Sequence, residues 1–241
     1  EHLSSRRKRT SEVLEEGGPP TAAGGHLPRA PVTLLTGFLG AGKTSRLNAS
    51  LAEGREKIAV IENEMGALGV DGALVANTHE DGVIELTNGC LCCSAEVDLV
   101  AALETLAHRR RTRPFDRVII ETTGLADVAP VVALLSDEDD PLTDDFVLDG
   151  VVTVVDAACF RSGWVARKIS ETSSSGGLLN REGAVATFWR QVALADQMIL
   201  SKEDLVGEVG DVREAVQAAN PLAEVLEGMV SLPPLRGRAR Q

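Results

Sequence analysis

Short apolar runs alternate with segments of helical periodicity along this chain of 241 residues. The runs are rich in valine, isoleucine and leucine with few polar interruptions, which is typical of strands that are buried on both faces. The predicted strands are VTLLTGF (32–38), KIAVIENE (57–64), GVIEL (82–86), DRVIIETTG (116–124), VLDGVVTVVDA (147–157) and ADQMILSKED (195–204). Helices are predicted between them, at 43–53, 95–111, 127–136, 184–194 and 208–219.

This alternation predicts an α/β fold in which helices sandwich a mostly parallel sheet. We expect one domain at 31–228, because polar and glycine-rich segments flank and interrupt it. Residues 1–30 are predicted to form a flexible N-terminal tail, residues 163–183 a mobile surface insertion, and residues 229–241 a C-terminal tail.

Charge and cysteine content exclude several classes of partner. The formal net charge is −12 and aromatic residues make up 3% of the chain, so the surface would repel nucleic acid and offers few platforms for stacking bases. No apolar run is long enough to span a membrane, and the N-terminus lacks the apolar core of a secretory signal.

Three of the four cysteines are crowded together, which fits metal or redox chemistry in a reducing compartment, so we expect a cytoplasmic protein. The fourth, Cys159, is expected in the core.

The segment GFLGAGKT matches the pattern G-x-x-x-x-G-K-[ST] of a phosphate-binding loop. It follows a predicted strand and opens a predicted helix, which is the context that the motif requires. Its glycines let backbone N–H groups approach phosphate oxygens, and the helix presents its positive end to them. Lys43 would reach the β- and γ-phosphates, and Thr44 would ligate Mg²⁺. The predicted nucleotide-binding residues of this loop are Gly37, Gly40, Ala41, Gly42, Lys43, Thr44 and Ser45.

A second segment that is predicted to lie beside the phosphates is RVIIETTG (117–124). Glu121 ends an apolar strand, where its carboxylate could hold the water shell of Mg²⁺ or polarise a water molecule. Gly124 could bring a backbone N–H to the γ-phosphate. The predicted catalytic residues are therefore Lys43, Thr44 and Glu121.

The tetrapeptide SKED after the last long strand is similar to the N-K-x-D guanine signature. The carboxylate of Asp204 would accept hydrogen bonds from the ring N–H and the amino group of guanine, and it would repel the lone pair that adenine presents at the same place. The stem of Lys202 would cover the ring face. Ser201 stands where the signature has asparagine, and its hydroxyl can replace some of the contacts of the amide, so guanine affinity is expected to be lower.

The segment GCLCCS holds Cys90, Cys92 and Cys93. Neighbouring cysteines do not easily form a disulfide with each other, because that bond needs a larger Cα separation. Three thiolates suit Zn²⁺ and also Cu(I), and they leave one tetrahedral position for Glu62 or Glu64, for water, or for a partner protein. Such an open shell suits a site that transfers its metal. The alternatives are a redox-sensing cluster and cysteines that are simply buried.

Together these segments resemble the CobW/HypB/UreG family of P-loop GTPases, in particular its CobW-like branch, over about residues 32–227. The segments that carry the resemblance are GFLGAGKT, IENEMG, GCLCC, ETTGLAD, VVTVVDA and SKED. It implies a P-loop NTPase fold and a GTP hydrolase that uses GTP and Mg²⁺, binds Zn²⁺ at the cysteines and delivers metal to a client metalloprotein, either alone or as a homodimer. By the same resemblance, Glu62 and Glu64 belong to a switch region and Glu121 lies on the Mg²⁺ side.

Three residues depart from the family pattern. Ser201 replaces asparagine, Val128 stands where proline is usual, and Ala67 stands where some relatives have a further acidic residue. The second, C-terminal domain of CobW-like proteins is expected to be absent. Arg46 and the arginine run 109–111 could neutralise charge in the transition state, but the spacing selects neither of them, so no such residue is assigned.

We therefore expect a zinc-responsive GTPase that acts as a metallochaperone and couples nucleotide hydrolysis to metal transfer. The alternatives are a P-loop ATPase or kinase-like enzyme with redox-sensing cysteines, and a non-catalytic metal-binding fragment.

Overall fold

The computed structural model describes residues 27–63, 84–85, 95–162, 181–228, 231–232 and 235. Over these residues the chain forms a sheet of seven strands in the order β3-β2-β4-β1-β5-β6-β7, and every strand pair is parallel. The strands are β1 (Ala30–Gly37), β2 (Ile58–Asn63), β3 (Ile84–Glu85), β4 (Arg117–Thr122), β5 (Phe146–Asp156), β6 (Gln197–Ser201) and β7 (Glu224–Leu226). The α-helices are α1 (Lys43–Glu53), α2 (Ala95–Arg110), α3 (Ala129–Ser136), α4 (Ala157–Arg161), α6 (Arg181–Ala193) and α7 (Gly210–Ala219). The predicted α/β class is confirmed.

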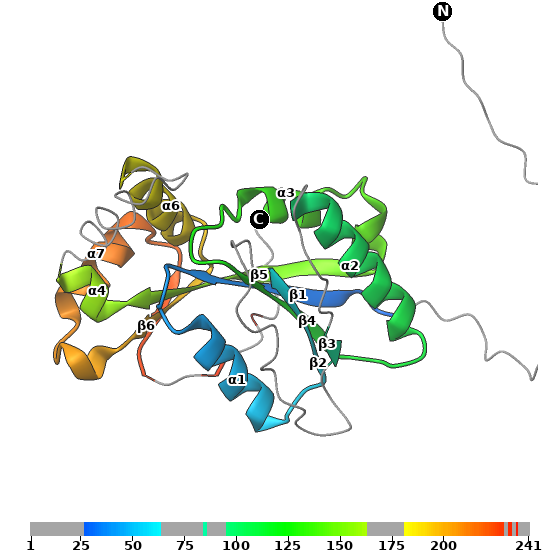
Figure 1. The fold of residues 1–241 in the computed structure, drawn as a ribbon, viewed down its shortest axis with the longest axis horizontal. Coiled ribbons are helices and arrows are strands. Elements are labelled where there is room, and N and C mark those ends of the chain that lie inside the picture. The colour runs from blue at the N-terminus through cyan, green and yellow to red at the C-terminus, as the bar shows by residue number, and fades with distance from the viewer. Residues whose placement is uncertain are drawn as a thin grey trace, which may run out of the picture.

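Different helices cover the two faces of the central strand, as Figure 1 shows. Val32 and Leu34 of β1 join a core cluster with Leu103 of α2, whereas Leu35 joins a separate cluster with Leu47 of α1. Side chains alternate between the faces of a strand, so a strand that is covered on both sides needs apolar residues at successive positions. This is the physical reason for the continuous apolar run that predicted β1.

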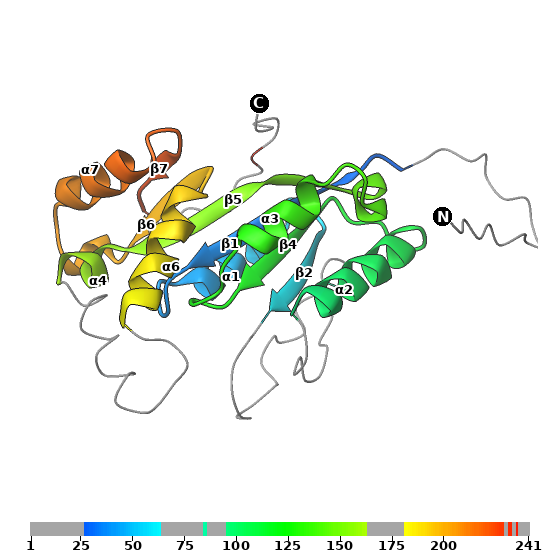
Figure 2. The ribbon, with the colours of Figure 1, turned by 90° about the horizontal axis from the view of Figure 1, so that it is seen from above.

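A third cluster fills the part of the sheet near β6. Phe188 and Val192 of α6 and Val216 of α7 pack there with Met198 and Leu200 of β6. Figure 2 shows α2, α3 and α6 crossing the same face of the sheet. None of the described helices combines the length and the apolar character that a bilayer-spanning helix needs.

The strand order places the chain reversal at β1. From this central strand the sheet continues through β4 to β2 on one side and through β5 to β6 on the other. In open parallel sheets, ligands bind beyond the carboxyl ends of the strands at such a reversal. The loops that follow β1 and β4 therefore meet at the expected ligand position.

The helix α4 and the strand β7 were not predicted from the sequence. The helix α4 follows β5 directly and is capped by Asp156, whose Oδ1 accepts a hydrogen bond from the backbone N–H of Cys159 at 2.7 Å. The strand β7 has only three residues, of which only Val225 is buried, so it carries no readable periodicity. Cys159 is buried, as expected.

The boundaries of the predicted tails and insertion also shift. The carbonyl of Pro28 accepts a hydrogen bond from Arg110 at 2.6 Å, so the contacts of the domain begin before residue 31. The helix α6 begins at Arg181, inside the predicted insertion 163–183, and residues 163–180 lie outside the described part.

Part of the predicted C-terminal tail belongs to the core. Leu232 is 2% exposed and Leu235 is 8% exposed, and both join the cluster on the α1 face. The backbone N–H of Leu232 donates to Ser50 Oγ of α1 at 2.7 Å, and its carbonyl accepts from Arg117 at 2.8 Å. The backbone N–H of Leu235 donates to Asp149 at 2.9 Å. The sequence did not indicate this, because two leucines in an irregular segment have no period.

Shortening Leu232 should therefore destabilise the domain. We expect Leu232→Ala to lower the free energy of unfolding by about 2–5 kcal/mol, the usual effect of truncating a fully buried leucine. Leu222 is 92% exposed and provides the matched control, since Leu222→Ala should change the stability by less than about 0.5 kcal/mol. Urea denaturation of both variants makes the comparison, and equal midpoints would show that Leu232 is not a core residue.

Candidate functional site

The loop between β1 and α1 has the backbone of a phosphate-binding turn. Gly42, the residue before the helix, has φ 96° and ψ 26°, a left-handed conformation that glycine adopts without steric cost. No side chain caps this end of α1, and no acidic residue lies in its first turn. The free N–H groups and the helix dipole therefore favour an anion here.

Lys43 is buried among carbonyl groups of the same loop. Its Nζ donates to the carbonyl of Gly37 at 2.9 Å and to that of Phe38 at 3.4 Å. Burial lowers the pKa of Lys43 from its usual 10.5, and the nearby carboxylate of Glu121 partly opposes this shift. An ammonium that is stripped of water and held at this loop is suited to a phosphate group.

Thr44 and Glu121, predicted to lie on the Mg²⁺ side, meet in space. The Thr44 hydroxyl donates to Glu121 Oε1 at 2.7 Å, although 77 positions separate the two residues. Oxygen ligands of this kind fit Mg²⁺, which binds few protein groups and keeps much of its water. The two side chains would thus hold the ion beside the phosphates, where it neutralises negative charge.

The proposed thiol cluster cannot be placed from the structure. Four of its residues lie outside the described part: Glu64, Cys90, Cys92 and Cys93. Its described flanks are Glu85, the last residue of β3, and Ala95, the first residue of α2. Glu62 is exposed on β2 and lies in register with Glu121 on β4, and adjacent strands are about 4.8 Å apart. Within the described ranges, no group of three or more His, Cys, Asp and Glu residues could hold a metal.

Ser201 joins the base loop, which we define as the segment SKED (201–204) at the end of β6, to the phosphate loop. Its hydroxyl donates to the carbonyl of Ala41 at 2.7 Å, and the carbonyl of Val155 lies at 3.3 Å. The side chain is 5% exposed. The serine therefore contacts the protein backbone here and holds the two loops together.

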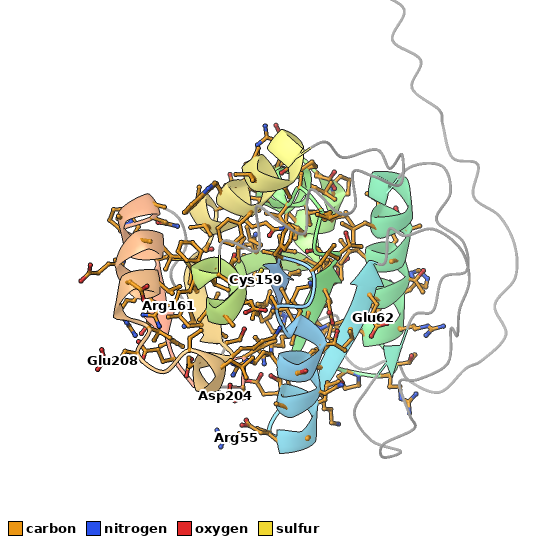
Figure 3. The ribbon with its side chains drawn as sticks, turned by 60° about the vertical axis from the view of Figure 1, so that its left-hand side comes forward. Arg55, Glu62, Cys159, Arg161, Asp204 and Glu208 are labelled. Carbon is orange, nitrogen blue, oxygen red and sulfur yellow. The ribbon has the colours of Figure 1, made fainter. Side chains whose placement is uncertain are left out.

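Lys202 has a strained backbone and a fixed ammonium. Its φ of 59° makes it the only non-glycine residue with positive φ among the described residues, a conformation that costs about 1–3 kcal/mol and is frequent at functional sites. Lys202 Nζ lies 2.5 Å from Asp156 Oδ2, at the end of β5. Asp204 is exposed, and Figure 3 shows it on the opposite side of α1 from Glu62. Asp156 was not predicted to take part, although an acidic residue at the end of an apolar strand is a readable signal.

Arg46 has a structural position that the sequence did not suggest. It is 4% exposed and donates to the carbonyl of Gly228 at 2.5 Å and to that of Leu200 at 3.4 Å. Burial lowers its pKa, and Glu203, which also accepts the N–H of Gly228 at 2.7 Å, opposes the shift. Arg46 thus connects α1 with the ends of β6 and β7, and these contacts hold its guanidinium instead of a phosphate.

The arginine run 109–111 lies at the end of α2 that is away from the carboxyl edge of the sheet. The helix α2 begins after β3 at the carboxyl edge of the sheet and ends at Arg110, just before β4 begins at Arg117. The run therefore lies at the amino edge, away from Lys43. Arg110 itself donates to Pro28 and stacks over Phe115 with its guanidinium carbon 5.4 Å from the ring centroid.

Gly124 lies directly against the phosphate loop. A Cβ on this residue would come within 2.4 Å of the backbone nitrogen of Leu39, so only glycine fits. The loop continues to Val128, which is fully buried before α3, while Pro130 occupies the first turn of that helix. The proline that is usual at 128 is thus replaced by one that opens α3 two residues later.

Comparison with known proteins agrees with these features. The model of the family described as CobW/HypB/UreG, nucleotide-binding domain, matches residues 31–227. The zinc chaperone CobW of a Sinorhizobium species is 37% identical over 201 residues, which are 79% of this chain and 55% of that protein. The zinc-regulated GTPase metalloprotein activator 1 of Schizosaccharomyces pombe is 35% identical over 210 residues, which are 83% of this chain and 46% of that protein.

A solved structure gives the same picture. The crystal structure of the Zn(II)-bound YjiA GTPase from Escherichia coli matches with a TM-score of 0.57 and 33% identity, and the match covers 87% of this chain and 61% of that one. The chain therefore spans about half the length of the curated relatives that it matches.

The lowered pKa of Lys43 predicts that nucleotide binding takes up a proton in alkaline solution. Bound phosphate would raise this pKa towards its usual 10.5. Below the lowered pKa, Lys43 is charged in both states and has no effect. Above it, affinity should fall as pH rises, by at most about tenfold per pH unit for one proton.

Calorimetric titration with GDP in buffers of different ionisation enthalpy, at a series of alkaline pH values below the usual 10.5, measures this proton. The control is Lys43→Arg. Its arginine stays charged at all these pH values, so this variant should bind GDP without taking up a proton. The same uptake in both proteins would assign the proton to another group.

Proposed function

The chain belongs to the CobW/HypB/UreG family, and from this we propose that it is a zinc-responsive GTPase that acts as a metallochaperone. GTP would lie across the loops after β1, β4 and β6, with Mg²⁺ at Thr44 and Glu121. The observation that carries this proposal is the 2.7 Å hydrogen bond between those two side chains. It brings the hydroxyl of Thr44 in the phosphate loop next to the carboxylate of Glu121 at the end of β4. The reaction is hydrolysis of GTP to GDP and phosphate.

Positioning and electrostatics supply the catalysis in this proposal. Lys43 and the start of α1 neutralise charge that develops on the phosphates. When Mg²⁺ is bound, it supplies further neutralisation and orients the phosphate oxygens. We identify no arginine near Lys43 among the described residues that is free for this task, so unassisted turnover should be slow, on the order of 10⁻⁴ to 10⁻² per second, as in GTPases without a partner.

Guanine would be selected by the loop after β6. Ser201 holds this loop against the phosphate loop, and the exposed Asp204 would accept the two N–H groups of guanine. Lys202, fixed at Asp156, limits the positions that the loop can adopt. An adenine base in the same place would present a lone pair to the carboxylate of Asp204, where guanine presents a ring N–H donor.

The zinc site would be coupled to the nucleotide site at the part of the sheet next to Glu121. In the proposal, Cys90, Cys92 and Cys93 bind Zn²⁺ with Glu62 or Glu64 as a fourth ligand. Support comes from Glu62, which lies one strand away from Glu121 and in register with it. A γ-phosphate that orders the loops at this edge would alter the zinc site, and zinc would alter nucleotide affinity by the same factor. The client is a metalloprotein, which we place with this chain in the cytoplasm.

Asp204→Asn tests the choice of base. The amide would present a donor to groups of guanine that are themselves donors, so GTP affinity should fall at least about 100-fold, as expected for two lost hydrogen bonds to a charged acceptor. The control is Glu208→Gln, which removes a charge from an exposed position four residues away and should have little effect. ATP that displaces a labelled GTP analogue from the wild type as well as GTP does would instead support the ATPase alternative.

Zinc should change the GTPase rate of the wild-type chain but not that of a variant with Cys90, Cys92 and Cys93 replaced by alanine. The reason is that only the wild type offers the three thiolates. Steady-state phosphate release, measured with and without Zn²⁺ for both proteins, gives four rates. Four equal rates would remove the metal coupling, while a folded chain that binds zinc but no nucleotide would favour the non-catalytic alternative.

A further inference from the structure

Gln191 is a buried amide that the proposed chemistry does not use. It lies on α6 and is 0% exposed. Its Nε2 donates to the carbonyl of Gly124 at 3.3 Å and to that of Ala126 at 3.1 Å. The backbone carbonyl of Gln191 accepts from Thr153 of β5 at 2.8 Å, so the residue is anchored to the sheet while its side chain reaches the loop after β4.

The contacted loop has little freedom on its other side. Gly124 lies so close to Leu39 of the phosphate loop that not even a methyl group fits between them. The backbone around Gly124 is therefore held between the phosphate loop and the Gln191 amide. A shift at either surface would move the backbone N–H of Gly124.

We propose that Gln191 is a positioning residue for the γ-phosphate: it fixes the loop at Gly124 so that the triphosphate, and not the diphosphate, finds the backbone N–H in place. The inference rests on the proposed GTPase function. In that proposal GDP would contact the phosphate loop and, lacking the γ-phosphate, would not reach Gly124, so only the triphosphate would depend on this loop.

The hydrogen-bonding pattern supports a specific use of the amide. Both N–H bonds of Nε2 point to carbonyl groups of one loop, whereas Oε1 is buried and has no hydrogen-bond partner in the described structure. A buried acceptor without a partner opposes folding. An apolar residue of similar size would fill the same space without that cost but could not hold the two carbonyls.

The neighbouring residue provides a comparison. Arg190 also reaches this loop, through an ion pair with Asp127 at 2.9 Å, but both side chains are substantially exposed. Exposed ion pairs contribute little. The buried amide of Gln191 is therefore the stronger constraint on the loop from α6.

Gln191→Met tests the proposal, because methionine keeps the volume and removes both donors. We expect affinity for a non-hydrolysable GTP analogue to fall about tenfold, as for the loss of two neutral hydrogen bonds, and kcat to fall with it, while GDP affinity changes less than about threefold. The matched control is Arg190→Met, which should leave both affinities and kcat within about threefold of the wild type. An equal loss for GDP and the analogue, or no loss for either, would overturn the proposal.

The wild type separates this inference from the function on which it rests. If the unmodified chain binds neither nucleotide, the GTPase proposal fails. If it binds both, and Gln191→Met binds them in the same ratio, only the role of Gln191 fails. Should Gln191→Met not fold, hydrogen exchange of the wild type replaces it. The amides of α6 should exchange more slowly with the GTP analogue than with GDP, and equal exchange would count against the link.

Discussion

The parallel pairing of β1 with β4 is the constraint on which the rest of the structure depends. It aligns Leu35 with Glu121, so the carboxylate emerges beside the loop that leads into α1. Only then can Thr44, at the start of α1, reach it. A one-residue slip would turn Glu121 to the opposite face of the sheet, because side chains alternate along a strand. The apolar residues on both faces hold the register, and the core thereby positions the site.

A second set of contacts connects this centre with the base loop. Ser201 binds the carbonyl of Ala41, and Arg46 bridges α1 to the ends of β6 and β7 through Leu200 and Gly228. Beyond β7, the backbone N–H of Leu232 donates to Ser50 Oγ of α1. The described C-terminal part of the chain therefore contacts α1 at two points, Arg46 in its first turn and Ser50 further along.

Much of this arrangement could be predicted where a local pattern carries the information. Strand β1 and helix α1 follow from an apolar run, three glycines and a lysine-threonine pair in a short span. The same holds for Glu121 at the end of β4. The role of Arg46 could not be predicted, because an arginine two residues after the threonine could point to phosphate or into the core, and only the carbonyls of Leu200 and Gly228 decide between them. The place of the run 109–111 could not be predicted either, because the edge of the sheet on which it lies depends on the direction of α2.

The sequence by itself determined the α/β class, the order of the main strands and helices and the phosphate-loop motif, and it supplied the candidate residues for nucleotide and metal, because these depend on periodicity and on close spacing along the chain. The tertiary structure decided which of those residues meet. Thr44 with Glu121, Ser201 with Ala41, and Gln191 with Gly124 are each brought together across 65 or more positions. Such contacts depend on strand order and register, which arise from the packing of the whole sheet and leave no mark in any short segment.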